Sequence, residues 1–154
     1  MKKERIGFAM CGSFCTHEAV LEALRSLTER YETVIPILSE TAAVTDTRFG
    51  TSAELLKALE QMTGREVLRD IPSVEPIGPK ALLDALVIAP ATGNTLGKLA
   101  AGITDTAVTM AAKAHLRNGR PVVIALASND GLSAGARNIG ELLVRKHYYL
   151  EQCR

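Results

Sequence analysis

The sequence predicts an α/β protein in which helices cover both faces of a doubly wound parallel sheet. Short apolar segments alternate along the chain with amphipathic ones, as in a series of βα units. The apolar segments are continuous rather than alternating, which is typical of strands buried on both faces. With 154 residues, 47% hydrophobic and 23% charged, the chain has the size and balance of a globular domain. We therefore expect residues 1–154 to form a single domain.

Five apolar segments are the predicted strands. The second contains Pro36, which lacks a backbone donor, so this strand is expected toward an edge of the sheet. The predicted strands are Arg5–Cys11, Thr33–Leu38, Leu82–Ala89, Pro121–Ala127 and Tyr148–Leu150.

The segments between the strands place apolar residues at the three- and four-residue spacing of amphipathic helices. Thr51 and Glu54 form a capping-box signature, and Gly64 is expected to end the same helix. Two stretches without a clear period, Ala42–Gly50 and Glu66–Pro79, are predicted to be largely irregular. The predicted helices are Thr16–Arg30, Thr51–Gly64, Thr95–Ala101, Thr106–Arg117 and Gly135–Lys146.

Composition and charge exclude several classes of function. A net charge of +1 gives no electrostatic footprint for nucleic acid or an anionic membrane surface. No apolar run approaches the length of a membrane span. The cysteines, Cys11, Cys15 and Cys153, form neither a disulfide framework nor a zinc-ligand pattern. We expect reduced thiols, no metal site and a cytoplasmic protein.

Small polar loops follow four of the predicted strands. Right-handed crossovers bring the loops after parallel strands to the same edge of the sheet. Ligands bind at that edge, where the strand order reverses. The converging loops are Gly12–Ser13, Ser39, Pro90–Thr95 and Ser128–Asp130.

The third of these loops has the strongest ligand signature. Pro90 fixes the turn, and Gly93 permits a close approach of the backbone. Polar side chains stand around them at the start of a predicted helix. An N-cap role would explain Asn94 or Thr95 alone, but not the whole set. The polar residues of this loop are Thr92, Asn94 and Thr95.

Gly12 and Ser13 stand just before a helix, where backbone amides and the helix dipole favour an anion. This pair also occurs in ordinary turns, so it supports a phosphate site only together with the other loops. It is not a G-x-G-x-x-G dinucleotide fingerprint. Ser39, rather than an acidic residue, follows the second strand, which argues against a dinucleotide ribose clamp.

The segment Ala89–Asp105 resembles the second signature of the flavin-dependent cysteine decarboxylase superfamily. Nearly the whole chain shares the resemblance, which is strongest to the branch formed by the B subunits of dipicolinate synthases. The other matching stretches are Arg5–Phe8, Gly12–Glu18, Thr45–Gly50, Glu75–Lys80 and Met110–Val123.

The resemblance implies a flavodoxin-like, Rossmann-type three-layer sandwich that binds FMN. Gly12 and Ser13 would lie at the phosphate or ribityl end of the flavin, and Ser39 would face it from the second strand. The helix start after the third strand would hold the phosphate or ribityl chain. The cofactor-binding residues expected beyond these three are Pro90, Thr92, Gly93, Asn94, Thr95, Ser128 and Asn129.

The same resemblance implies partners. Proteins of this branch are expected to form trimers or larger homo-oligomers. They work with an A subunit, which would supply NAD(P), and convert a small dicarboxylate, a dihydrodipicolinate-type precursor, into dipicolinate. The implied setting is the cytoplasm of the mother cell in a sporulating bacterium.

Three departures from the superfamily pattern matter. The decarboxylases place a catalytic histidine in the neighbourhood of Val74–Ile77, whereas the histidines here are at 17, 115 and 147. Ala127–Asn129 also replaces most of their Pro-Ala-Met-Asn motif. Cysteine decarboxylation is therefore not expected. Members of the branch usually continue past Tyr148–Leu150 with a proline-rich segment and a last helix, which this sequence lacks.

Arg48 and His17 are the candidate catalytic residues. Arginine binds carboxylates bidentately, so Arg48 is a candidate clamp for a diacid; the alternatives are an ion pair with Asp46 or packing at a subunit contact. His17 lies near the expected pocket and could donate a proton, or be an ordinary surface histidine. Lys80 and Lys113 are further cations.

Two other residues near the expected pocket have open roles. Cys11 ends a strand beside a helix start, where a thiol pKa can be lowered; the alternative is a small buried hydrophobic residue. Asp130 could contact a ligand or cap the following turn.

Three functions remain possible from the sequence. The first is an oxidoreductase-type enzyme subunit with a flavin pocket, since aromatising a dihydropyridine ring releases two electrons to a flavin or nicotinamide. The second is a non-catalytic partner that stabilises the A subunit without a redox cofactor. The third is a flavin-dependent decarboxylase, against which the missing histidine argues.

Overall fold

A computed structural model describes residues 1–131 and 133–152, and Cys153 lies outside them. Its five strands form one parallel sheet in the order β2-β1-β3-β4-β5. This order reverses direction between β1 and β3, which is the switch point of the flavodoxin-like fold. The predicted doubly wound parallel sheet is confirmed. The strands are β1 (Lys2–Met10), β2 (Tyr31–Leu38), β3 (Ala85–Ala91), β4 (Val122–Leu126) and β5 (Tyr148–Gln152).

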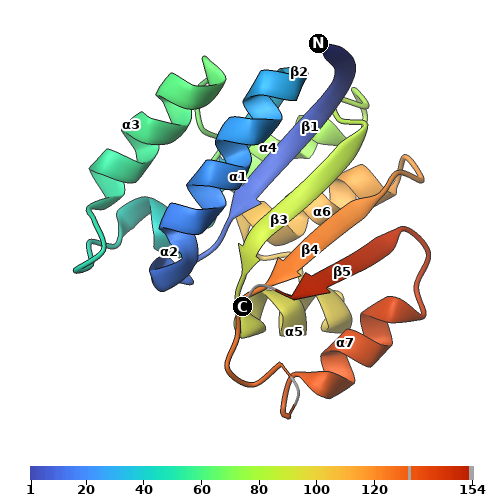
Figure 1. Ribbon diagram of the computed structural model, residues 1–154. Helices are drawn as coiled ribbons and strands as arrows, with labels where there is room; N and C mark the ends of the chain where they lie inside the picture. The colour runs from blue at the N-terminus through green and yellow to red at the C-terminus, as the bar shows by residue number, and fades with distance from the viewer. Residues whose placement is uncertain (132, 153–154) are drawn as a thin grey trace.

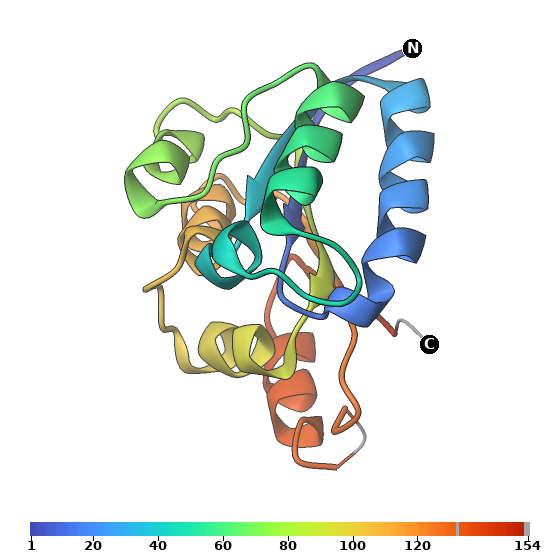
Figure 2. The ribbon, with the colours of Figure 1, turned by 90° about the vertical axis from the view of Figure 1, so that its left-hand side faces the viewer.

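Helices lie on both sides of the sheet and make a three-layer sandwich (Figures 1 and 2). α1 and α3 cover one face, α4 and α6 cover the other, and α5 and α7 lie at the end toward which the strands point. The α-helices are α1 (His17–Arg30), α2 (Glu40–Val44), α3 (Ser52–Thr63), α4 (Ile71–Val74), α5 (Gly93–Ala101), α6 (Ala107–Leu116) and α7 (Ala136–Leu143). The 3-10 helices are η1 (Phe14–Thr16) and η2 (Glu75–Ile77).

Each face of the sheet has its own apolar core. Alternate residues of β1 enter different cores: Phe8 and Met10 pack toward α1 and α3, whereas Ala9 packs toward α6. The helix α6 is alanine-rich and its inner face is fully buried, so it lies close against the sheet. Two buried cores explain why the strands are continuously apolar.

β2 is an edge strand, as Pro36 predicts. It pairs with β1 alone among the named strands, and the Pro36 carbonyl accepts from the Leu68 amide on the outer side. A proline is tolerated there because the donor it lacks would face away from the neighbouring strand.

The third strand is shifted from its predicted position. It was expected at Leu82–Ala89 and runs over Ala85–Ala91, so Pro90 lies within it rather than in the following turn. The ladder to β4 is irregular between Ile88 and Ala91, which accommodates the missing proline donor. The Ala89–Pro90 peptide bond is cis.

Two stretches predicted to be irregular contain short helices. In the first, Ser39 accepts from the Ala42 amide and caps α2, whose Ala42 and Ala43 are buried in the core. In the second, Asp70 and Ser73 form a reciprocal capping box around α4. Helices this short lack a readable apolar period, and local capping and tertiary burial stabilise them.

Other helix boundaries moved by a few residues. α3 has the predicted capping box at Thr51 and a left-handed Gly64 after its last turn. α7 ends at Leu143 instead of continuing to Lys146. Arg145 follows the end of α7, and its guanidinium donates hydrogen bonds to two carbonyls in the last turn of α5 and to Glu141.

Asp84 fixes the start of β3 against β1. Its carboxylate accepts from the Arg5 amide at 2.7 Å and from two guanidinium nitrogens of Arg5 at 3.1 Å each, with Arg120 at 3.4 Å. The hydrogen bonds from Arg5 lower the pKa of Asp84 from 3.8 to about 2.

We expect Asp84→Asn to lower the free energy of unfolding at neutral pH by about 1 kcal/mol, since the pair is partly exposed to solvent. Because the folded-state pKa of Asp84 is depressed, its stabilisation is present above the ordinary pKa and is lost as the pH falls toward 2. Urea unfolding between pH 6 and pH 2.5 should therefore show that the difference in free energy of unfolding between the two proteins shrinks as the pH falls. A difference that stays constant with pH would contradict this role.

Candidate functional site

The four polar loops predicted from the sequence meet at the carboxyl edge of the sheet. The loops after β1, β3 and β4 are hydrogen-bonded together. The Cys11 amide donates to the Pro90 carbonyl at 3.0 Å, and the Ala127 amide donates to the Ala91 carbonyl at 2.9 Å. The hydroxyl of Ser13 donates a hydrogen bond to the Ala127 carbonyl at 2.9 Å, between the loops after β1 and β4. The edge is thus a connected rim at the switch point between β1 and β3.

Backbone donors are available on this rim. The amides of Gly12 and Ser13 after β1, and those of Gly93 and Asn94 at the start of α5, donate to no acceptor within residues 1–131 and 133–152. The first amides of a helix have no intrahelical partner and carry the positive end of the helix dipole. The Gly93 and Asn94 amides are of this kind, whereas those of Gly12 and Ser13 belong to the loop before η1. Two groups of free amides on neighbouring loops can bind an anion such as a phosphate.

The N-cap of α5 is not one of the residues expected from the sequence. Thr92, rather than Asn94 or Thr95, is the N-cap, and its hydroxyl oxygen accepts from the Thr95 amide at 3.1 Å. The Thr95 side chain is buried, and its hydroxyl donates to the Cys11 thiol sulfur at 3.3 Å. Asn94 is exposed on the rim. Asn94 is therefore the side chain of this loop that is free to meet a ligand.

The two glycines of the rim differ in what they accommodate. A Cβ atom on Gly93 would lie 3.2 Å from the Ser128 hydroxyl, so Gly93 makes room for the loop after β4. A Cβ atom on Gly12 would meet only ordinary contacts, at 3.5 Å from Phe14 and 3.6 Å from Thr41. Internal packing therefore does not require a glycine at position 12.

Cys11 is a buried, protonated thiol. It is 1% exposed, and burial raises its pKa to about 11. Of the two roles open from the sequence, the structure supports the small buried hydrophobic residue and excludes a thiolate at neutral pH.

His17 is buried at the start of α1 and is not a surface histidine. Its Nε2 donates to the Cys11 carbonyl at 2.8 Å, and its ring packs against Phe14. Burial lowers its pKa below the ordinary value, opposed by the hydrogen bond to Cys11. His17 is therefore neutral at pH 7, with Nδ1 as an acceptor.

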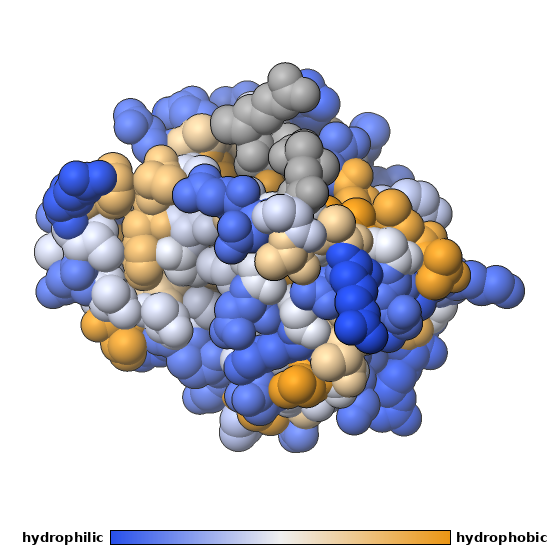
Figure 3. Space-filling model, turned by 90° about the horizontal axis from the view of Figure 1, so that it is seen from below, coloured by the Kyte–Doolittle hydropathy of each residue, from blue (hydrophilic) through white to orange (hydrophobic). Residues whose placement is uncertain are grey.

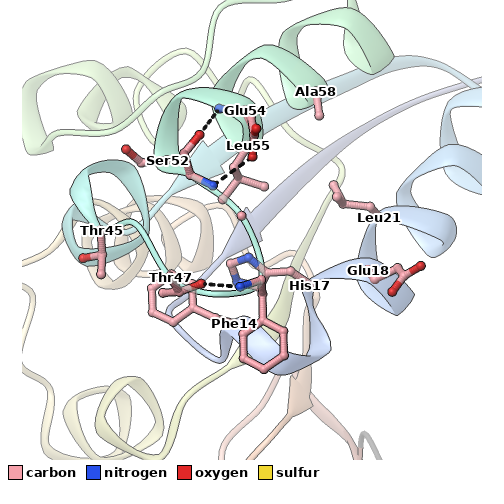
Figure 4. A pocket seen from close by; sticks show the side chains of 13 residues that line it. Phe14, His17, Glu18, Leu21, Thr45, Thr47, Ser52, Glu54, Leu55 and Ala58 are labelled. Carbon is pink, nitrogen blue, oxygen red and sulfur yellow. Dashed lines mark hydrogen bonds between the residues drawn. The ribbon is translucent and has the colours of Figure 1, made fainter.

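A cavity of about 320 Å³ lies beside the rim, between the start of α1 and the start of α3 (Figure 4). Phe14 and His17 come from one side, and Leu55 and Ala58 come from α3. The cavity is aromatic and aliphatic with a hydroxyl-rich wall, which suits a flat ring with polar edges. Its other lining residues are Glu18, Leu21, Thr45, Thr47, Phe49, Gly50, Thr51, Ser52 and Glu54.

Arg48 stands next to this cavity without lining it. Its guanidinium lies 4.9 Å from the centre of the Phe49 ring, and both side chains are exposed. Arg48 and Asp46 form no ion pair among the described residues, and Asp46 Oδ1 instead accepts from the amide and hydroxyl of Ser52 at 2.8 and 3.2 Å. The Arg48 guanidinium forms no ion pair with another described residue.

The remaining predicted residues lie at the edges of the site or away from it. Ser128 accepts from the Asp130 amide at 3.2 Å, Asn129 is exposed, and the Asp130 backbone carbonyl closes the following turn. Lys80 is in an exposed turn, and Lys113 is on α6 on the opposite face from α1. Within the described residues there is no group of His, Cys, Asp and Glu suited to a metal ion.

Sequence reasoning missed the cavity. Phe14 and Phe49 belong to its wall, yet both stand in segments without secondary-structure periodicity. Aromatic residues make up only 4% of the chain, and two of them stand beside the expected ligand loops. This coincidence is the sequence signal that could have indicated the cavity.

A family model described as Flavoprotein matches residues 1–138. The chain belongs to the flavoprotein family. It is 44% identical over 149 residues to the B subunit of the dipicolinate synthase of Bacillus subtilis (strain 168), a match that covers 97% of this chain and 74% of that protein. These matches confirm the resemblance found in the sequence.

Solved structures agree with this membership. The crystal structure of the corresponding B subunit of dipicolinate synthase from Bacillus halodurans C has 40% identity and a TM-score of 0.84, covering 96% of this chain and 75% of that one. The FMN-dependent cysteine decarboxylase TvaF from thioviridamide biosynthesis has 26% identity and a TM-score of 0.76, covering 97% and 90%.

The surface of this flavoprotein-family chain at the end toward which the strands point is mostly hydrophilic (Figure 3). Hydrophobic residues form separate patches there rather than one continuous area. Among the described residues, no helix is long and apolar enough to cross a membrane.

Proposed function

We propose that this chain binds FMN at the rim and acts as the B-type subunit of a dipicolinate synthase. The observation that carries the proposal is the set of unpartnered amides at Gly12, Ser13, Gly93 and Asn94, gathered at the switch point of a flavoprotein-family fold. The names of its relatives supply the reaction: two are B subunits of dipicolinate synthases, and a third is an FMN-dependent enzyme.

The residues present fit the cofactor. The four amides would hold the phosphate, with Asn94, Ser128 and Ser39 nearby for the ribityl chain. The cavity bounded by Phe14 is next to them and has the apolar walls that a flavin ring or a flat substrate requires. FMN, when bound, accepts the two electrons that aromatising a dihydropyridine ring releases.

The chain's own residues would bind and orient the substrate. Among the described residues, the cavity is lined by Glu18 and Glu54 and by no lysine or arginine, so a cation for a diacid would have to come from beside the cavity. Arg48 at the mouth supplies a cation for a carboxylate. His17 lines the cavity, and its Nδ1 would accept a proton there, since Nε2 donates to the Cys11 carbonyl. An A-type partner would supply a nicotinamide and complete the enzyme.

Two measurements test the proposal. Titration of the purified chain with FMN should show saturable binding, and dipicolinate formation should require both this chain and the A-type partner. Absence of FMN binding, together with full activity of the complex, would instead make the chain a non-catalytic stabilising partner. Release of CO₂ from a peptide with a C-terminal cysteine would identify the decarboxylase alternative.

Arg48→Ala should raise the Kd or KM for the diacid about tenfold or more while leaving FMN affinity unchanged, because the charge removed faces the substrate alone. Arg65→Ala, which removes an exposed cation at the far end of α3, is the matched control. Equal loss of diacid and FMN binding, with dissociation of the oligomer, would show that Arg48 serves a contact between copies of the chain.

A further inference from the structure

A second cavity lies on the opposite face of the sheet, away from the FMN rim. Its volume is about 420 Å³, within the range of about 300–1,000 Å³ of small-molecule sites. It opens between the end of α5, the outer face of α6 and the start of β5. The lining residues are Leu99, Gly102, Ile103, Thr104, Thr109, Lys113, Leu116, Arg117, Arg145 and Tyr148.

This cavity is separate from the rim. Its Gly102 follows the last residue of α5, whereas the rim contains the first residues of that helix. A helix of nine residues is about 14 Å long, and this length separates the two sites.

The charge of the second cavity is of one sign. Lys113, Arg117 and Arg145 line it, and no aspartate or glutamate does. Lys113 and Arg117 are one helical turn apart on α6, and neither forms an ion pair with another residue that the structure describes. Lys113 and Arg117 also line a neighbouring cavity together with Glu75, but neither is within the 4.0 Å of an ion pair with it. Lys113 in the last turn of α6 and Arg117 at its C-cap thus present two cations without an ion-pair partner, and such a pair attracts an anion.

Arg145 brings a third cation from the other side. Its guanidinium is held by the carbonyls of Leu99 and Ala100 and by Glu141. These contacts use three of the five guanidinium N–H groups, so two donors remain for a ligand. The guanidinium is thus fixed in place before any ligand arrives.

Apolar side chains lie between these cations. Leu99, Ile103 and Leu116 provide aliphatic surface, and the half-buried ring of Tyr148 adds an aromatic one. An inorganic anion would leave this surface in water, whereas an organic body would cover it. Cations on two sides of an apolar surface match an apolar body with a carboxylate at each end.

We propose that this cavity, between Lys113 and Arg117 on one side and Arg145 on the other, binds a small organic dicarboxylate. It is a second site, independent of FMN and of the reaction at the rim. Its distance from the rim suits an effector or a reservoir site rather than a part of the reacting centre.

The probe is benzene-1,3-dicarboxylate, titrated into the purified chain of residues 1–154 by calorimetry with and without FMN. We expect one molecule bound per chain. Lys113→Gln combined with Arg117→Gln should raise the Kd at least tenfold, because both charges on one side of the ligand are lost. Lys57→Gln combined with Arg69→Gln, which removes two exposed cations elsewhere, should leave the Kd within twofold.

Ligand controls complete the test. Neutral benzene-1,3-dicarboxamide should not bind, and inorganic phosphate should bind at least tenfold more weakly than the dicarboxylate. No saturable binding, an unchanged Kd in the Lys113/Arg117 variant, or equal affinity for phosphate would each overturn the proposal. Dissociation of the oligomer in that variant, without any dicarboxylate binding, would overturn it by making this face an interface between copies of the chain. FMN titration of the same variants keeps this result separate from the proposed function.

Discussion

Replacing Asn94 with Asp should lower the affinity for FMN at least a hundredfold while the fold keeps its stability. Asn94 is the second residue of α5, exposed on the rim beside unpartnered amides. A carboxylate at this helix position interacts favourably with the dipole and contributes about 0.3–1 kcal/mol to stability. The same charge would repel the phosphate of FMN, since two unit charges about 4 Å apart interact by about 4 kcal/mol near a protein surface.

A matched control uses another helix. Ala53 is the second residue of α3, exposed, and outside the lining of the cavity beside the rim. Ala53→Asp should bring the same small gain in stability and leave FMN affinity unchanged. Riboflavin, which lacks the phosphate, should bind the Asn94→Asp variant and the unchanged protein alike. Equal loss of riboflavin and FMN would show that the phosphate does not lie at the start of α5.

Replacing Gly7 with Ala should destabilise the protein by about 1–3 kcal/mol. Gly7 lies in β1, at the centre of the sheet, and a Cβ atom there would be 2.5 Å from Leu83 and 2.9 Å from Leu86. Both leucines are fully buried, so neither side chain can move aside without disturbing the core under α6. Urea unfolding at neutral pH measures the effect.

Two further variants distinguish crowding from a general intolerance of substitution. Gly140 is in α7, where a Cβ atom would meet nothing within 4 Å. Gly140→Ala should stabilise the protein by up to about 1 kcal/mol, as expected for glycine replaced within a helix. Leu83→Val should offset part of the loss caused by Gly7→Ala, because it shortens the crowding side chain by one carbon. Strict additivity of the two changes would contradict the steric explanation.

The carboxyl-edge rim could be predicted from sequence because the argument depends on topology alone. Apolar strands with polar ends, joined by right-handed crossovers, bring Gly12, Ser39, Pro90 and Ser128 to one edge whatever their side chains do. What each side chain does there was not predictable. Thr92 became the cap and Thr95 turned inward to Cys11, because several residues in succession can cap a helix and packing selects among them.

The two cavities were beyond the reach of the sequence. The cavity beside the rim is lined by residues as far apart in sequence as Phe14 and Ala58, and the second cavity by residues from Leu99 to Tyr148. Each cavity therefore depends on how separate elements pack together. Lys113 is an ordinary solvated cation in the sequence pattern, and helical spacing places it near Arg117, but the cavity that both share with Arg145 arises only from the tertiary structure.

The amino-acid sequence by itself therefore determined the alternation of strands and helices, the edge position of β2 and the gathering of the polar loops at the carboxyl edge of the sheet. These features follow from hydrophobic periodicity, the missing donor of Pro36 and the handedness of the chain, which are local properties. The tertiary structure alone decided the partners of individual side chains, the burial of His17 and the shapes of the cavities. These depend on contacts between residues distant in the chain, which no local pattern encodes.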